Sequence, residues 1–223
     1  MDSLRKTSLW AGVLYLITFV SIPTLALYGP VHEADFMLGS GSDTGVFFGG
    51  ILELIVALAG IGTAVVLYPV VKRQSQGRAL GLVGSRVLEG TMIFAGVASL
   101  LTVVALRQSG VGADGLVTGQ ALVGLYDKTF LVSQSFIPAV NALLLGSLLY
   151  QSGLVPRKLP LLGLIGAPIL IAAFVGTMFG AWDSSSAQTA IATIPIAVWE
   201  FSLGAYLAFK GFKPSPISAG MPA

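Results

Sequence analysis

The run that decides the fold of this chain is LGLVGSRVLEGTMIFAGVASLLTVVAL, from Leu80 to Leu106. It is long and apolar enough to predict a helix that spans a membrane. Its two charged residues, Arg86 and Glu89, are costly to bury in hydrocarbon unless they are paired or have a function. Because they are three residues apart, they share one face of a helix and can neutralise each other.

The composition of the whole chain indicates the same class of protein. Of 223 residues, 55% are hydrophobic and 10% are charged, and the mean hydropathy is +0.87. Soluble domains carry about 25% charged residues. We therefore expect a polytopic integral membrane protein whose main partner is the lipid bilayer. The net charge of +2 gives no indication of a nucleic-acid partner.

Cysteine and histidine usage limits the chemistry. The chain has no cysteine, which excludes disulfides, thiolate metal sites and thiol redox chemistry. A single histidine excludes a bis-histidine haem or a multi-histidine metal cluster. This residue, His32, lies with Glu33 and Asp35 in an acidic loop, where we expect it to be solvated rather than to bind a metal. We predict no metal and no cofactor.

Apolar runs along the chain predict an all-α, polytopic membrane bundle of six transmembrane helices in one domain, residues 1–211. The spans are expected at about 8–28, 46–71, 80–106, 130–150, 159–179 and 188–209. A short interfacial helix is predicted at 116–126, before the fourth span. The Pro-, Gly- and Ser-rich tail at 212–223 is predicted to be disordered.

Positive charges predict the orientation of the spans, because Lys and Arg favour the cytoplasmic side. With the N-terminus in the cytoplasm, Arg107 and Lys128 fall outside. The basic residues that then fall inside are Arg5, Lys6, Lys72, Arg73, Arg78, Arg157, Lys158, Lys210 and Lys213. We therefore predict that both termini are cytoplasmic.

Polar residues inside the predicted spans are the candidates for a functional site. At a rise of about 1.5 Å per residue, four of them form a layer from the bilayer centre to about 10 Å toward the cytoplasm. These four are Arg86, Glu89, Asn141 and Glu200. The other two, Glu53 and Gln134, lie about 8 Å toward the outside.

The charges in these two layers do not balance. Three carboxylates and one guanidinium would leave two negative charges unpaired in the membrane. We expect at least one of Glu53 and Glu200 to carry a proton, or a cation to be bound. One interpretation is a site for a cationic or proton-coupled ligand, or for acid catalysis on a lipid-soluble substrate. The alternative is structural: Arg86 holds Glu89 and Glu200 together, and Glu53 is bonded to Gln134.

Three functions remain open on these residues. The leading hypothesis is a protein that binds or transports a small molecule, ion or lipid between Glu200, Glu89, Asn141 and Glu53, with or without proton coupling. The alternative from the enzyme class is an intramembrane lipid-modifying enzyme with Glu53 or Glu200 as proton donor, and we favour the non-enzymatic interpretation. The third is an accessory subunit of a membrane complex. Assembly with itself or with a partner subunit is left open.

Several motifs resemble one family. They are Leu14-Tyr-Leu-Ile-Thr-Phe, Leu52-Glu53-Leu54 with Leu67-Tyr68-Pro69, Arg86-x-x-Glu89, Asn141-Ala-Leu-Leu-Leu-Gly146 with Leu154-Val-Pro-Arg157, and Trp199-Glu200 followed by Leu203-Gly204. The motifs occur in the order of that family. From about Lys6 to Phe212, the chain resembles the bacterial membrane family called domain of unknown function 4386. The resemblance implies a six-helix protein of the bacterial inner (plasma) membrane, and it implies no activity.

Overall fold

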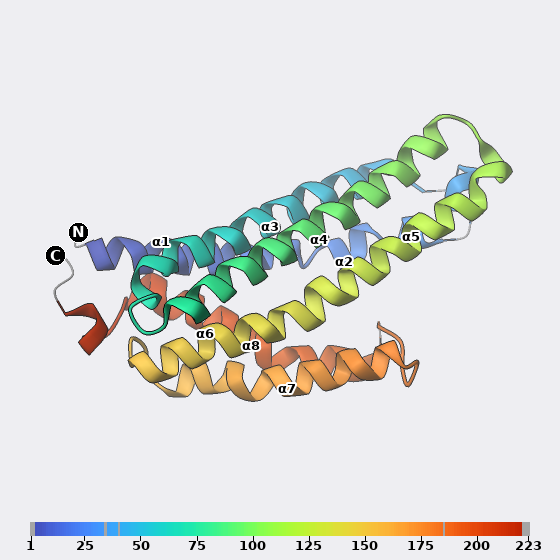
Figure 1. The fold of residues 1–223 in the computed structure, drawn as a ribbon. Helices are drawn as coiled ribbons and strands as arrows, with labels where there is room; N and C mark the ends of the chain where they lie inside the picture. The colour runs from blue at the N-terminus through green and yellow to red at the C-terminus, as the bar shows by residue number, and fades with distance from the viewer. Residues whose placement is uncertain (1–2, 34, 40, 185, 220–223) are drawn as a thin grey trace.

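The computed structural model describes residues 3–33, 35–39, 41–184 and 186–219, and these residues form helices and turns without a strand (Figure 1). The α-helices are α1 Ser3–Ile17, α2 Thr24–Leu27, α3 Asp43–Val71, α4 Gln76–Gln108, α5 Leu116–Leu131, α6 Ile137–Ser152, α7 Lys158–Met178 and α8 Ala187–Phe209. A 3₁₀ turn, η1 Thr18–Ser21, follows α1, and a π-helical segment, η5 Val132–Phe136, joins α5 to α6. The predicted all-α class is confirmed.

Within the described residues, five helical stretches are long and apolar enough to cross a membrane. They are α3, α4, α7, α8 and the run Gly112–Ser152, which contains α5 and α6. The predicted span at 8–28 begins as α1, but this helix ends at Ile17 and gives way to η1, Pro23 and the single turn α2. Pro23 has no backbone N–H, so an unbroken α-helix would lack one of its hydrogen bonds here.

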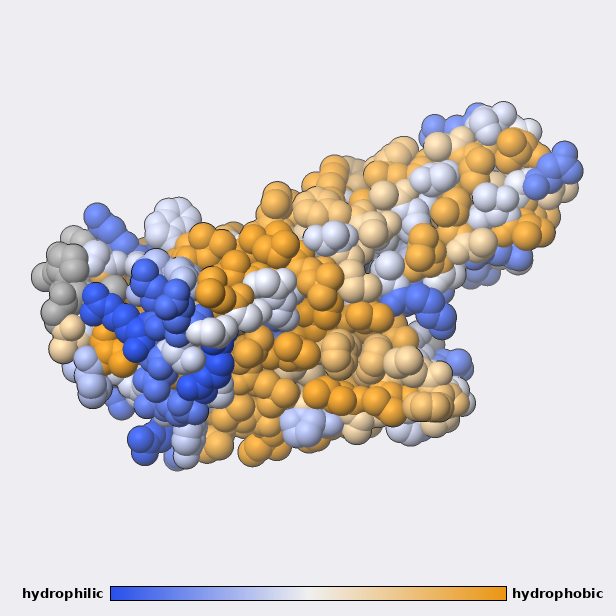
Figure 2. All heavy atoms as spheres, in the orientation of Figure 1, coloured by the Kyte–Doolittle hydropathy of each residue, from blue (hydrophilic) through white to orange (hydrophobic). Residues whose placement is uncertain are grey.

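Large apolar side chains cover much of the outer surface of the helices (Figure 2). Leu58, Ile165 and Phe201 are each more than half exposed. A water-soluble monomer rarely exposes so continuous an apolar surface, whereas lipid chains are a suitable solvent for it. Together with the length of the helices, this surface identifies an integral membrane protein.

Neighbouring helices pack in an order that closes the bundle. α3 lies along α4, α6 along α7, and α7 along α8, while α1 contacts both α3 and α8. The largest buried cluster joins these helices around Trp199 and Leu145, whose side chains are fully buried. A second cluster, around Tyr28, Phe36 and Tyr126, lies between the start of α3, the end of α4, and α5.

α3, α4 and α5 project as an arm beyond the ends of α7 and α8 (Figure 1). From their residue counts, α4 is about 50 Å long and α7 about 31 Å, and the shorter length is close to the thickness of the hydrocarbon core. At the end of the arm, Arg107 of α4 donates to Asp43 Oδ1 and to the carbonyl of Gly41, each at 2.9 Å. These bonds tie the loop before α3 to the end of α4.

The segment 116–126, predicted as a short helix before the fourth span, is helical and is not separated from that span. It begins a continuous helical run through α5, η5 and α6. Leu122 and Tyr126 pack in the second buried cluster, which explains why this stretch of mixed polarity stays helical and in contact with α4.

The segment 212–219, predicted as part of a disordered tail, packs against the bundle in the structure. The N–H of Lys213 donates to the carbonyl of Leu154 at 2.8 Å. Phe212 and Ile217 contact the main buried cluster, and burying their apolar surface offsets the entropy lost on ordering. The last residues of the predicted tail, 220–223, lie outside the described residues.

Candidate functional site

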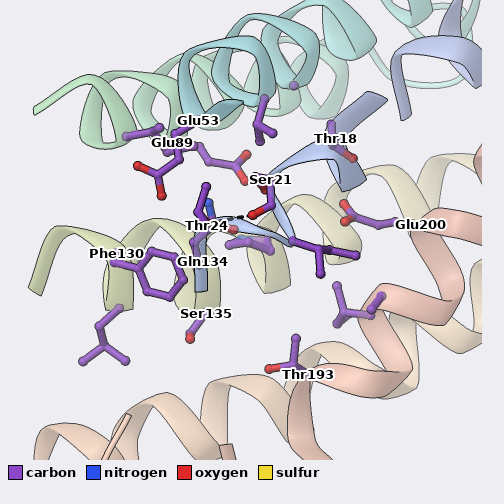
Figure 3. A pocket seen from close by; sticks show the side chains of 18 of the residues that line it. Thr18, Ser21, Thr24, Glu53, Glu89, Phe130, Gln134, Ser135, Thr193 and Glu200 are labelled. Carbon is purple, nitrogen blue, oxygen red and sulfur yellow. Dashed lines mark hydrogen bonds between the residues drawn. The ribbon is translucent and has the colours of Figure 1, made fainter. Parts of the chain in front are cut away.

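A cavity of about 550 Å³ lies between α3 and α4 on one side and α8 on the other (Figure 3). η1 and α2 run along it, and η5 and the start of α6 form a further wall. Its lining contains five of the six residues predicted from the sequence, namely Glu53, Arg86, Glu89, Gln134 and Glu200.

Arg86 joins two of the three carboxylates. Its Nη1 donates to Glu89 Oε2 at 2.9 Å, and its Nη2 donates to Glu200 Oε1 at 2.8 Å. Glu89 is one turn further along α4 whereas Glu200 lies on α8, so the guanidinium bridges two helices. The side chains of Arg86, Glu89 and Glu200 are 4%, 9% and 15% exposed. The structure therefore brings Arg86, Glu89 and Glu200 together, as the structural interpretation of the sequence predicts.

Asn141 and Tyr15 complete the surroundings of Arg86. Asn141 on α6 is fully buried and donates from Nδ2 to Glu89 Oε2 at 2.8 Å. Tyr15 on α1 accepts from Nη2 of Arg86 at 3.4 Å, and its ring centroid lies 5.6 Å from the guanidinium carbon. Four helices therefore meet in the Arg86 cluster, which comprises Tyr15, Arg86, Glu89, Asn141 and Glu200. Tyr15 is not predicted as a site residue from the sequence, because a tyrosine in an apolar run resembles an ordinary packing residue.

One oxygen of each carboxylate in the Arg86 cluster remains available. Glu89 receives both of its hydrogen bonds on Oε2, and Glu200 receives its bond on Oε1. Among the described residues no donor binds Glu89 Oε1 or Glu200 Oε2. Each of these two oxygens retains some accessible surface. Since both residues line the cavity, these two oxygens are accessible to a ligand inside it.

Glu53 is held separately by two tyrosines. Tyr126 donates its hydroxyl to Oε1 at 2.9 Å, and Tyr28 donates to Oε2 at 3.3 Å. The two rings pack edge to face, with centroids 5.3 Å apart. The structural interpretation of the sequence expects a hydrogen bond between Glu53 and Gln134. No such bond is present among the described residues. The tyrosines take its place because the chain after Pro23 turns back so that α2 packs on α3, and because α5 packs along α4.

Gln134 lines the cavity from the π-helical segment η5. Pro138 follows this segment and has no backbone N–H to donate to the carbonyl four residues earlier, which is that of Gln134. A local rearrangement of the helix relieves this defect, and π-helical segments are frequent at functional sites. The rearrangement brings Gln134 and Ser135 to the cavity wall.

Hydroxyl groups line the cavity along the interrupted first segment. Thr18, Ser21 and Thr24 all belong to its lining (Figure 3). Oγ1 of Thr18 donates to the carbonyl of Tyr15 at 2.6 Å, and Oγ1 of Thr24 to that of Ser21 at 2.7 Å. Irregular backbone is tolerated at membrane depth where it lines a cavity. The interruption therefore places polar groups beside the charged residues.

His32 is paired rather than merely solvated. Its Nε2 lies 3.0 Å from Asp127 Oδ1, and its Nδ1 lies 2.7 Å from the carbonyl oxygen of Tyr28. The hydrogen bond with Asp127 raises the pKa of His32. Because Tyr28 binds Glu53 and Asp127 directly follows Tyr126, this pair stabilises the two tyrosines that hold Glu53.

Comparisons with known proteins give one match. A family model described as "Domain of unknown function (DUF4386)" matches residues 10–211. The matched range contains the whole Arg86 cluster, together with Glu53 and the two tyrosines that bind it. No curated protein and no solved structure matches the chain.

Proposed function

Since this chain belongs to the DUF4386 family, whose description names no activity, we propose its function from the cavity: it binds or transports a small molecule or ion at this buried acidic site. The observation that carries the proposal is a cavity of about 550 Å³ with three carboxylates and one guanidinium in its lining. Small-molecule sites in proteins have volumes of about 300–1,000 Å³.

The balance of charge supports a ligand rather than a purely structural cluster. If all four groups are ionised, the lining carries two more negative charges than positive ones. Uncompensated charge is expensive at this depth, so a bound cation or a proton is needed to balance it. A site that exchanges a proton for a ligand would use the same groups.

The interrupted first segment also supports a ligand site. Transporters place substrate and ion sites beside discontinuous helices, where polar backbone and side chains are available at membrane depth. Here α1 is interrupted by η1, and the hydroxyls of Thr18, Ser21 and Thr24 lie along the same cavity as Glu53 and Glu200.

We also propose that the chain crosses the bacterial inner membrane six times with both termini in the cytoplasm, α1 and η1 serving as the first span. Support comes from hydrophilic groups gathered at the end of the bundle where α1 begins and α8 ends (Figure 2). Lys72 follows α3, Arg157 precedes α7 and Lys210 follows α8. These helix ends belong to the same end of the bundle (Figure 1). Basic residues favour the cytoplasmic side of a membrane.

The test of the proposed function is recovery of a bound molecule. The protein is purified from its host membrane in mild detergent, and the small molecules that accompany it are identified by mass spectrometry. A companion variant, Ala197→Phe, places a large ring in the cavity wall beside Glu200, whereas the matched variant Ala98→Phe adds the same ring at an exposed position of α4.

We expect a molecule that accompanies the wild type and Ala98→Phe in near-stoichiometric amount and is lost from Ala197→Phe. Identical contents in all three proteins would overturn the proposal. Folding of each variant is checked by thermal unfolding, so that a lost ligand is not confused with a lost fold.

A further inference from the structure

We propose that the ligand of this cavity is an organic monocation with an apolar body, bound through its positive charge to Glu89 and Glu200. The inference rests on the proposed function, because it names the class of molecule that the same cavity takes. It is carried by the charge of the Arg86 cluster, by the two available carboxylate oxygens and by the apolar lining around them.

The Arg86 cluster lacks one positive charge. Arg86 offsets one of the two carboxylates it binds, and the other charge has no partner among the described residues. The available oxygens, Glu89 Oε1 and Glu200 Oε2, belong to side chains that are 9% and 15% exposed, so little water screens them. A single positive charge neutralises the cluster, whereas an anion would be repelled by it.

Glu53 has a different role from these two residues. Both of its oxygens accept hydrogen bonds from tyrosines, and its exposed fraction is 4%. A ligand would have to displace a phenol to reach it. The cationic group therefore binds on the side of Glu200, which is the most exposed of the three carboxylates.

The rest of the lining is suited to an organic body rather than to a bare metal ion. It contains Ile22, Val56, Ile93, Leu170 and Ile196 as well as the aromatic rings of Phe19 and Phe130. Aliphatic walls bind apolar surface, and aromatic faces attract organic cations. A metal ion would instead need a shell of oxygen ligands to replace its water. A volume of about 550 Å³ admits a molecule of drug size.

Two probes of nearly the same size and shape but opposite charge test this inference. Tetraphenylphosphonium is a monocation and tetraphenylborate is a monoanion. Their binding to the full-length protein in detergent is measured by equilibrium dialysis, with empty micelles subtracted. The comparison needs no mutation, so it stands even if a variant fails to fold.

We expect tetraphenylphosphonium to bind at least about tenfold more tightly than tetraphenylborate. Glu200→Gln should weaken the cation by at least about tenfold, because it removes the charge with little change of shape. Glu53→Gln should weaken it less. The control Glu33→Gln removes a carboxylate from the exposed loop before α3 and should leave binding unchanged.

Equal affinity for the two probes, or an unchanged affinity in a folded Glu200→Gln protein, would overturn the inference. If Ala197→Phe still abolishes binding in that case, the cavity remains a ligand site and only the class of ligand is wrong. If Ala197→Phe changes the binding of neither probe, the assignment of a monocation to this cavity fails, and the recovery of a native molecule decides the proposed function separately.

Discussion

At the scale of single residues, Arg86 is the positively charged side chain that the described residues contribute to the lining of the cavity. A buried ion pair adds little net stability, but removing one partner leaves an unpaired buried charge that costs about 3–5 kcal/mol. Arg86 has two such partners, Glu89 and Glu200, on different helices. Its removal therefore affects both the charge balance and the contact between α4 and α8.

We predict that Arg86→Met lowers the free energy of unfolding by about 3–5 kcal/mol, measured by thermal unfolding in detergent. Changing Glu89 and Glu200 to Gln in the same protein should restore most of the loss, because the unpaired charges are gone. The control Arg78→Met removes a guanidinium that binds Ser147 and Gln151 near the surface and should have a much smaller effect. A folded Arg86→Met protein of unchanged stability would contradict the role given to Arg86.

His32 gives a prediction for pH dependence. Its pKa is raised by the hydrogen bond with Asp127, so the folded state holds the proton more tightly than the unfolded state. The stabilisation is fully present below the unfolded pKa of about 6.5 and is lost as the pH rises through the higher folded pKa. Because both side chains are about 40% exposed, it should amount to about 0.2–1 kcal/mol.

The measurement compares thermal unfolding at pH 5.5 and pH 8.5 in the wild type and in Asp127→Asn. The wild type should lose more stability toward alkaline pH than the variant does. Parallel pH profiles would show that the His32–Asp127 pair contributes nothing measurable.

At the scale of helices, α1 and α8 approach each other at glycines. A Cβ added to Gly12 would lie 2.6 Å from the carbonyl oxygen of Gly204 and even closer to the backbone nitrogen of Ala208. Backbone atoms cannot move aside as the end of a flexible side chain can. The close contact between these helices therefore depends on the absence of a side chain at Gly12.

We predict that Gly12→Ala lowers the free energy of unfolding by about 1–3 kcal/mol, because α1 must move away from α8. The matched variant is Gly84→Ala on α4, where an added Cβ meets nothing within 4 Å. It should be neutral or stabilising by about 0.5–1 kcal/mol, since alanine favours helix more than glycine does. Equal effects of the two substitutions in thermal unfolding would show that the helix contact is not specific.

The elements that could be predicted from the sequence are those set by local patterns. The apolar runs predict α3, α4, α7 and α8 because length and hydropathy are properties of each run alone. The pair Arg86–Glu89 follows from its spacing within one helix. The tyrosines that bind Glu53 could not be predicted, because their positions depend on how the chain turns back after Pro23 and on how α5 packs along α4.

At the scale of the whole molecule, charge is distributed along the long axis. Most basic residues outside the cavity lie at the end where α1 begins, whereas Arg107 and Lys128 lie on the arm. The acidic residues Glu33, Asp43 and Asp114 lie at or near the end of the arm. This distribution supports the proposed topology, with the arm on the outer side of the membrane. The chain contains no cysteine, so single cysteines can report the side of each end.

We predict that Asp114→Cys reacts with a membrane-impermeant maleimide in intact cells and that Lys213→Cys reacts after the membrane is permeabilised. Both positions are exposed in the structure, so a lack of reaction reports the membrane barrier rather than burial. The reverse pattern would invert the orientation. Labelling of both positions in intact cells would contradict six spans.

The contact between α1 and α8 also has a consequence for biogenesis. α1 is synthesised first and α8 last, and at about 5–20 residues per second roughly 10–40 s separate the emergence of the two helices from the ribosome. During this interval the face of α1 that contains Gly12 has no α8 to pack against, and Arg86 cannot yet bind Glu200. A stalled or truncated chain remains in that state. Completion of α8 is therefore the late step at which both contacts can form, and no shorter chain can form either of them.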